Sequence, residues 1–161
     1  MAKSSLLTYI PSMDKKVNKI DPLRESELNR ASELFLFAYR AFTAGPDRIL
    51  EGRGLQRVHH RILYFVGRNP GIAVNGLLAT LGVSKQALNA PLRQLQEMGL
   101  VDAQAALADG RVRELRLTSE GARLEQSLTG GQRRRMDAIF RDVGPEAEAG
   151  WRAVMDRLAA G

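Results

Sequence analysis

The feature that most constrains the fold of this chain is a very short turn between two amphipathic segments. Leu77, Leu78 and Leu81 recur at helical spacing, which predicts a helix with one apolar side. Gly82 interrupts that helix, and Ser84 can act as the N-cap of a second helix only three residues after Leu81. Two helices joined by so tight a turn form a helix-turn-helix.

The second segment, at about 84–98, has two chemically different sides. Leu88, Leu92 and Leu95 share one side, which we expect to pack against a core. The opposite side carries the hydrogen-bonding side chains of Lys85, Gln86, Asn89, Arg93 and Gln96. Gly99 favours the left-handed conformation in which many helices end. The pattern predicts a helix that packs on one face and can bind a partner with the other.

Pro91 lies in the middle of this second helix. A proline there removes one backbone hydrogen bond and costs about 3 kcal/mol in a regular helix. We expect a kink near Ala87. Two interpretations stay open: the kink re-aims the first turns of the helix, or the proline is a tolerated irregularity.

Residues 101–117 predict a β-hairpin. Asp109 and Gly110 form a turn signal, and the residues that follow alternate between polar and apolar types up to Leu117. The first strand is less clear, because AQAALA at 103–108 has helical propensity. Local sequence therefore leaves strand and helix both open for that stretch.

Helices are expected on both sides of this region. Asp21 and Pro22 are typical of an N-cap and a first helical position, and a long helix follows that we expect to end at Gly45 and Pro46. A short helical turn at 47–51 comes next. Residues 1–20 are expected to form a flexible arm.

Further helices are predicted nearer to and beyond the hairpin. One contains Val58 and Ile62 and is stopped by NPG at 69–71. Another opens with TSEG at 118–121, and the last contains Trp151. We interpret the glycine-rich points of the chain, such as the pair at 130–131, as helix breaks.

The absence of cysteine limits the possible chemistry. It excludes disulfides, thiolate metal sites and cysteine redox sensors. The two histidines, His59 and His60, are adjacent, and neighbouring helix positions point about 100° apart, so we expect no metal site and no cofactor. We interpret His59 as a semi-buried structural histidine and expect His60 to face solvent or a neighbouring helix.

Charge and length point to a soluble protein with an anionic partner. Lys and Arg number 24 against 18 Asp and Glu, the net charge is +6 and the isoelectric point is about 10.2, which makes nucleic acid a plausible partner. A chain of 161 residues suits one compact domain with helical extensions. No apolar run reaches the roughly 18 residues of a membrane helix, so we expect a cytoplasmic location.

Four short blocks, taken in order, resemble the MarR family of bacterial regulators over roughly residues 23–160. The blocks are LGVS at 81–84, LQEMGLV at 95–101, DGR at 109–111 and LTSEG at 117–121. The resemblance implies a mainly α fold with a small β-hairpin wing, a winged helix-turn-helix flanked by N- and C-terminal dimerisation helices. Where the family usually has basic residues, this chain has Asp102, Ala103 and Gln104. The base of the wing should therefore bind DNA phosphates more weakly than in other members of the family.

The same resemblance implies a division of the chain and a mode of DNA binding. Residues 21–52 would contribute to dimerisation, 53–118 would form the DNA-binding lobe, and 119–161 would complete the dimer. It implies a homodimer on double-stranded DNA with a palindromic operator. The recognition helix at about 84–98 would enter the major groove and the wing at about 101–117 the minor groove.

The candidate DNA contacts follow from side-chain chemistry and from this resemblance. Gln and Asn can hydrogen-bond adenine edges and Lys and Arg can hydrogen-bond guanine, whereas an arginine at the wing tip fits a narrow minor groove. The alternative for the helix residues is an ordinary polar surface. We assign DNA binding to Ser84, Lys85, Gln86, Asn89, Arg93, Arg111, Arg113 and Arg116.

The resemblance also implies control by a small aromatic or phenolic effector between the dimerising helices and the DNA-binding lobe. The aromatic candidates to line such a site are Phe35, Phe42, Tyr64 and Phe65. The alternative is that they are simply core residues.

We expect no enzymatic activity, since we find no nucleophile with a base, paired carboxylates, metal cluster or phosphate-binding glycine loop. The alternative function is a winged-helix module that binds protein or RNA and has no operator. The arginine run at 133–135 is interpreted as a solvated face of the dimerisation region rather than a second nucleic-acid patch.

Overall fold

The computed structural model describes residues 21–106 and 111–160 and divides into two units, which meet at Phe37 and Ala38. The first unit holds the N-terminal part of helix α1 (Pro22–Glu51), and the second holds the rest of the chain. The arm expected at 1–20 and the hairpin turn expected at Asp109 and Gly110 lie outside the described residues. None of the described helices is long and apolar enough to cross a membrane.

Helix α1 begins as predicted but does not end where we expected. The Glu25 backbone N–H donates to the Asp21 carbonyl at 2.8 Å, so the helix starts at Pro22. It then continues through Gly45 and Pro46 to Glu51, and the predicted end at this pair is wrong.

The continuation of α1 has a local physical reason. Pro46 has no N–H to donate to the carbonyl of Phe42, four residues earlier. That carbonyl instead accepts a hydrogen bond from Gln132 Nε2 at 3.1 Å, and Arg135 Nη1 donates to the neighbouring Ala41 carbonyl at 2.8 Å. Both donors come from helix α5 (Ser119–Val143), so tertiary contacts replace the backbone bond that the proline removes.

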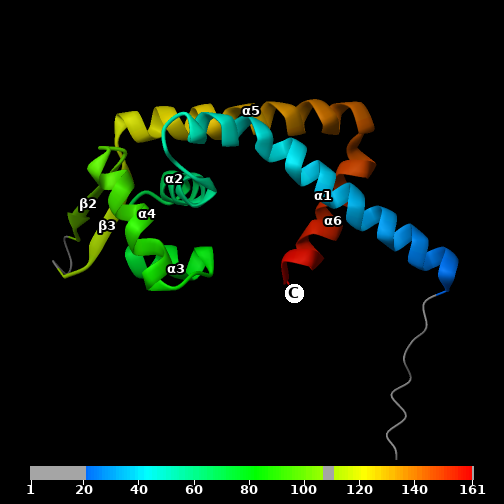
Figure 1. The fold of residues 1–161 in the computed structure, drawn as a ribbon, viewed down its shortest axis with the longest axis horizontal. Coiled ribbons are helices and arrows are strands. Elements are labelled where there is room, and N and C mark those ends of the chain that lie inside the picture. Colours follow the sequence, from blue (N-terminus) through cyan, green and yellow to red (C-terminus); the bar gives the residue numbers. More distant parts are fainter. Residues whose placement is uncertain (1–20, 107–110, 161) are drawn as a thin grey trace, which may run out of the picture. The chain divides into compact units, whose positions relative to one another are not determined.

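The predicted helix-turn-helix is present, between α3 (Val74–Leu81) and α4 (Lys85–Glu97), with α2 (Arg57–Arg68) before it (Figure 1). Gly82 adopts a left-handed conformation with φ of 62°, and its N–H donates to the Leu78 carbonyl at 3.0 Å. The Ser84 hydroxyl accepts the Ala87 backbone N–H at 3.2 Å, which confirms the N-cap of α4.

The C-terminal end of α4 is also built as the sequence indicates. Gly99 has φ of 65°, and its N–H donates to the Gln96 carbonyl at 2.9 Å. The Leu100 N–H donates to the Leu95 carbonyl at 2.9 Å, which completes a Schellman motif. Pro91 lies inside this helix, which is continuous from Lys85 to Glu97.

A small antiparallel sheet is formed with the two strands that follow α4. Strands β2 (Val101–Ala105) and β3 (Arg113–Leu117) form the predicted hairpin, and Val101 pairs with Leu117. Residues 103–105 of the ambiguous stretch are thus strand, because pairing with β3 outweighs the helical propensity of the alanines, and residues 107–108 lie outside the described residues. A short strand β1 (Ile72–Ala73), which we did not predict, pairs with the other edge of β3 and gives the order β1-β3-β2.

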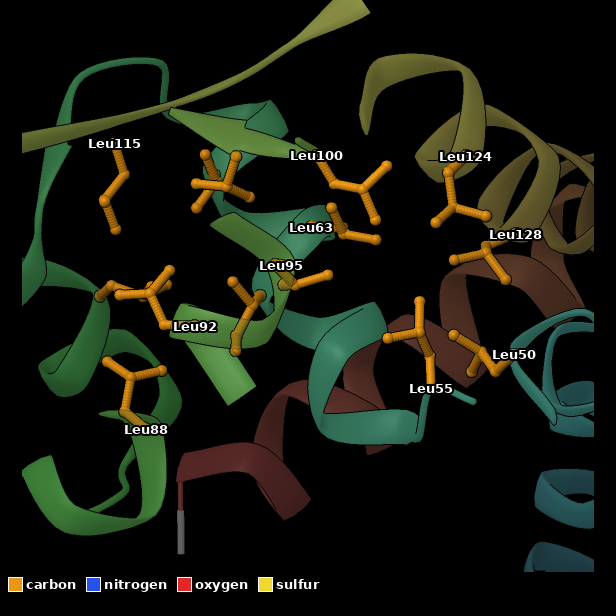
Figure 2. Close-up of a cluster of buried hydrophobic side chains, with 14 residues drawn as sticks. Leu50, Leu55, Leu63, Leu88, Leu92, Leu95, Leu100, Leu115, Leu124 and Leu128 are labelled. Carbon is orange, nitrogen blue, oxygen red and sulfur yellow. The ribbon is translucent and has the colours of Figure 1, made fainter. Parts of the chain in front are cut away.

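One hydrophobic core joins the helix-turn-helix, the sheet and the first half of α5. Its side chains are mostly leucines that point into a common interior in Figure 2. The buried apolar residues are Leu50, Leu55, Ile62, Leu63, Val66, Leu77, Leu88, Leu92, Leu95, Leu100, Val101, Leu115, Leu124 and Leu128. Because Leu88, Leu92 and Leu95 belong to this set, the predicted packing face of α4 is confirmed.

Helix α5 is longer than the sequence suggested. It runs without interruption through Gly130 and Gly131, so the interpretation of this pair as a helix break is wrong. A glycine inside a helix costs only about 1 kcal/mol relative to alanine, and the burial of Leu128 and Thr129 beside the pair favours the helical path. Gly144, with φ of 89°, ends α5 before α6 (Pro145–Ala160) begins.

The backbone of α5 meets the start of β2 at Gly121 without an intervening side chain. A Cβ atom placed on Gly121 would lie 1.9 Å from the Leu100 carbonyl oxygen. Thr118 fixes this approach, because its N–H donates to the Leu100 carbonyl at 3.2 Å and its hydroxyl donates to the Gly99 carbonyl at 2.7 Å. The Gly121 N–H in turn donates to the Thr118 hydroxyl at 3.0 Å.

Gly121→Ala should lower the free energy of unfolding by about 3 kcal/mol, at the upper end for overpacking, because the clash is with backbone that cannot rotate away. The matched control is Gly131→Ala in the same helix, where no other described atom lies within 4 Å of the added Cβ. That change should raise stability by about 0.5 to 1 kcal/mol. Chemical denaturation measures both, and equal effects of the two substitutions would contradict the close approach.

Candidate nucleic-acid interface

A groove of about 630 Å³ lies between α4 and the hairpin. It brings together four of the residues that the sequence assigned to DNA binding: Gln86, Asn89, Arg93 and Arg113. All four are exposed, and the buried Leu92 and Leu115 form part of its apolar lining. The groove therefore presents hydrogen-bonding side chains from a helix and from a strand on one side of the molecule.

The first turn of α4 holds two further predicted residues. Ser84 is exposed, and its hydroxyl oxygen serves as the N-cap. Lys85 is the first helical residue and is also exposed. Its ammonium therefore adds positive charge at the helix end where the backbone dipole already favours an anion.

The two arginines of the groove are held differently. Arg93 Nε lies 3.6 Å from a Glu97 carboxylate oxygen, and its side chain is 73% exposed. Pairs of this kind are weak, so the guanidinium can exchange its partner at little cost. Arg113 Nη2 donates to the Ala103 carbonyl at 2.6 Å, which holds its guanidinium beside the groove.

The remaining two wing arginines are not part of this groove. Arg116 lies on the face of β3 opposite the buried Leu115, and its Nη2 atom is 3.2 Å from a Glu114 carboxylate oxygen. In the strand register it faces Asp102. Arg111 is exposed and precedes β3 by two residues.

Polar contacts attach α4 to the N-terminal end of α2. His59 is only 4% exposed, and its Nδ1 atom accepts the Gln56 backbone N–H at 2.9 Å. Its Nε2 atom lies 2.9 Å from Gln94 Oε1, and Gln94 Nε2 donates to the Gly54 carbonyl at 3.2 Å. The interpretation of His59 as a structural histidine is thus confirmed.

We name the groove between α4 and the hairpin the DNA groove, after the contacts expected of its residues. A second cavity, of about 730 Å³, shares no lining residue with it and lies between α2, α5, α6 and the end of α1. Phe42 and Tyr64, two of the four aromatic candidates, line it together with Phe140. Phe65 packs against the core instead, and Phe35 belongs to the first unit, where its side chain is 54% exposed. Of the predicted effector residues, the structure therefore brings two together.

We name this cavity the effector cavity, after the ligand that the sequence analysis expects there. Its wall is rich in positive charge. It includes four arginines and two carboxylates, which are Arg61, Arg133, Arg141, Arg152, Asp137 and Glu148. Arg141 pairs with Asp137 at 2.9 Å and Arg152 with Glu148 at 2.5 Å. The cationic excess and the aromatic lining give the cavity chemistry suited to an aromatic anion.

His60 joins α2 to α5 at the edge of the effector cavity. Its Nε2 atom lies 3.2 Å from the Thr129 hydroxyl, so it faces a neighbouring helix, one of the two options that the sequence left open. Burial lowers the pKa of His60 below its usual value, and the carboxylates of Glu125 and Asp47 oppose that shift. Burial at this position therefore favours the neutral form of the imidazole.

Arg57 attaches α1 to α2 near the same place. It donates two hydrogen bonds to the Asp47 carboxylate, at 2.9 and 2.6 Å, and a third to the Thr43 hydroxyl at 3.1 Å. The hydrogen bond from Arg57 holds the pKa of Asp47 below its usual value. This bidentate pair fixes the end of α1 that carries Phe42.

The order of elements and their geometry agree with known proteins. The sequence profile of the MarR family matches residues 53–112. The chain is 46% identical over 136 residues to the HTH-type transcriptional regulator PetP of Rhodobacter capsulatus, and the alignment spans 84% of this chain and 82% of PetP. The chain belongs to the MarR family. It is therefore a helix-turn-helix transcriptional regulator that binds DNA, and its relatives are regulators rather than enzymes.

Solved structures support the same fold. A crystal structure of a MarR family transcription regulator superposes with a TM-score of 0.68 at 20% identity, over 84% of this chain and 90% of that one. A mutant of S. aureus MepR bound to an oligodeoxyribonucleotide superposes with a TM-score of 0.55 at 18% identity, over 81% and 96% of the two chains. The predicted winged helix-turn-helix is confirmed.

Two features of this MarR-family chain were beyond sequence reasoning. Phe140 is not among the aromatic candidates of the sequence analysis, because helical spacing does not distinguish a cavity wall from a core. The hydrogen bond between His59 and Gln94 spans 35 residues, and no local pattern indicates it.

The lowered pKa of His60 predicts a pH dependence of stability. Below about pH 6.5 the unfolded chain binds a proton before the folded protein does, so the free energy of unfolding should fall as the pH falls through this range. In His60→Asn this part of the pH dependence should be lost. Denaturation of both proteins at several pH values measures the difference, and parallel curves would contradict the buried neutral imidazole.

Proposed function

We propose that this MarR-family protein is a sequence-specific homodimeric regulator that inserts α4 into the major groove and the hairpin wing into the minor groove. The observation that carries the proposal is the groove in which Gln86, Asn89, Arg93 and Arg113 meet. Gln86, Asn89 and Arg93 lie on a different side of α4 from Leu88 and Leu95, which enter the core. Packing and binding therefore do not compete for the same face.

The chemistry of α4 suits recognition of base edges. The major groove of B-form DNA admits one α-helix, and amide side chains can bond the donor and acceptor pair of adenine. Gln86 and Asn89 are exposed amides one helical turn apart. We infer that Arg93 and Arg113 contact the phosphates beside the base edges. Lys85 and Ser84 would contact the phosphates at the helix N-terminus.

Apolar surface supports the proposal of a homodimer. In the first unit Leu23, Leu34, Leu36 and Phe37 are largely exposed, although a helix with such residues gains nothing from facing water. In the second unit the end of α5 and helix α6 also expose large apolar side chains, which are Ile139, Val143, Trp151, Val154 and Leu158. We infer that a second copy covers these surfaces, with palindromic half-sites about one turn of DNA apart.

We further propose that a small aromatic or phenolic anion in the effector cavity modulates DNA binding. The aromatic rings of Phe42, Tyr64 and Phe140 offer stacking surfaces, and the excess of arginine over carboxylate favours a negative charge. Gln132 supports a regulatory role, because it lines the cavity and also donates to the Phe42 carbonyl of α1. A bound ligand would thus contact residues that join three helices.

The DNA-binding proposal predicts that substitutions in the helix change base preference, whereas substitutions in the wing change overall affinity and its salt dependence. Asn89→Ala should reduce affinity for the preferred DNA by about 1 to 3 kcal/mol and relax the preference at particular base pairs, while nonspecific binding survives. Arg111→Ala should instead weaken binding to most sequences and reduce the dependence on salt by about one unit per subunit. Fluorescence anisotropy with selected and scrambled duplexes over a salt titration distinguishes the two.

Asn69→Ala is the matched control, because this exposed amide at the C-terminal end of α2 does not line the DNA groove. It should bind like the unmodified protein. The assignment is wrong if Asn89→Ala lowers all affinities equally without changing base preference. Binding with no base preference in the unmodified protein would instead support a winged-helix module for protein or RNA.

A further inference from the structure

The attachment of α4 to α2 consists of a chain of directional bonds in which every polar atom has a defined role. Because His59 Nδ1 accepts a backbone N–H from Gln56, the proton of the neutral ring lies on Nε2. That N–H donates to Gln94 Oε1 at 2.9 Å, which leaves the Gln94 amide nitrogen to donate to the Gly54 carbonyl. The amide orientation of Gln94 is thus fixed on both sides.

The apolar contacts of α4 with the core lack this directionality, and the hydrogen bonds from Thr118 hold only the C-terminal end of the helix. Leu88, Leu92 and Leu95 enter the core, and apolar burial depends on the area removed from water rather than on angle. A helix held by leucines alone can rotate by a fraction of a turn and bury almost the same area. The bonds to Gln94 oppose such a rotation, because a hydrogen bond tolerates only a few tenths of an ångström in length.

Rotation of α4 matters for recognition. Side-chain ends lie about 5 to 6 Å from the helix axis, so a rotation of about 20° displaces them by about 2 Å. Such a displacement removes a bidentate contact to a base, whereas a long, flexible arginine can follow a phosphate. Base preference is therefore more sensitive to the rotation of α4 than overall affinity is.

We propose that His59 is a positioning residue for DNA recognition: acting through Gln94, it fixes the rotation of α4 and so determines which base edges Gln86 and Asn89 face. This inference rests on the proposed DNA-binding function. His59 does not touch DNA in this scheme, since it is buried at the side of α4 that faces α2.

The test separates positioning from stability by removing both partners together. In His59→Leu the Gln94 amide loses its donor, and stability and base preference should both fall. In the double variant His59→Leu, Gln94→Leu, two apolar groups replace the bonded pair, which can restore much of the stability. We expect the ratio of affinities for selected and scrambled duplexes to stay about tenfold or more below that of the unmodified protein.

The matched control is Asn69→Ala, which removes a side-chain hydrogen bond to the Phe65 carbonyl at the other end of α2. It should lower stability and leave the affinity ratio unchanged. If the double variant does not fold, Gln94→Met is judged by the same ratio; it removes both hydrogen bonds of the Gln94 amide and leaves His59 in place.

A folded double variant, or Gln94→Met, with the unmodified ratio would overturn the positioning role while leaving the proposed function intact. An unmodified protein with equal affinity for selected and scrambled duplexes would overturn the proposed function and this inference with it. The two failures are therefore distinguished by the unmodified protein alone.

Discussion

The architecture depends on the direct backbone contact between α5 and the start of β2. Gly121 lies against the Leu100 carbonyl, and Leu100 follows the glycine that ends α4. Thr118 closes the arrangement by bonding to the carbonyls of Gly99 and Leu100 while capping α5. The end of the recognition helix, the base of the wing and the first turn of α5 therefore share one set of bonds. A shift of α5 along its axis would therefore also displace the end of α4.

Helix α2 connects the two places where we expect ligands to bind. His59 faces α4 through Gln94, whereas the next residue, His60, faces α5 through Thr129 and lines the effector cavity. Both imidazoles bond through Nε2, and each faces a different neighbour because adjacent helix positions diverge by about 100°. Helix α2, whose apolar residues Ile62, Leu63 and Val66 are fully buried, thus contacts both α4, which lines the DNA groove, and α5, which lines the effector cavity.

Sequence reasoning succeeded where one residue determines the local backbone conformation. It failed where a contact with a distant part of the chain determines whether a helix ends or a strand forms. The turn at Gly82 and Ser84 and the end of α4 at Gly99 follow from cap chemistry, and the structure has them as predicted. The breaks expected at Pro46 and at the glycines 130–131 are absent, because donors and packing from other helices compensate. Strand β1 is two residues long and exists only through pairing with β3.

The central claim, that α4 carries the DNA-binding surface, is tested most directly by photo-crosslinking. A photoreactive amino acid is placed at Ala90, which is exposed and lines the DNA groove, and in a separate variant at the exposed Ala153 of α6. Each protein is irradiated with a selected duplex. The account predicts a protein–DNA crosslink from Ala90 and none from Ala153. Crosslinking from Ala153 without crosslinking from Ala90 would contradict it.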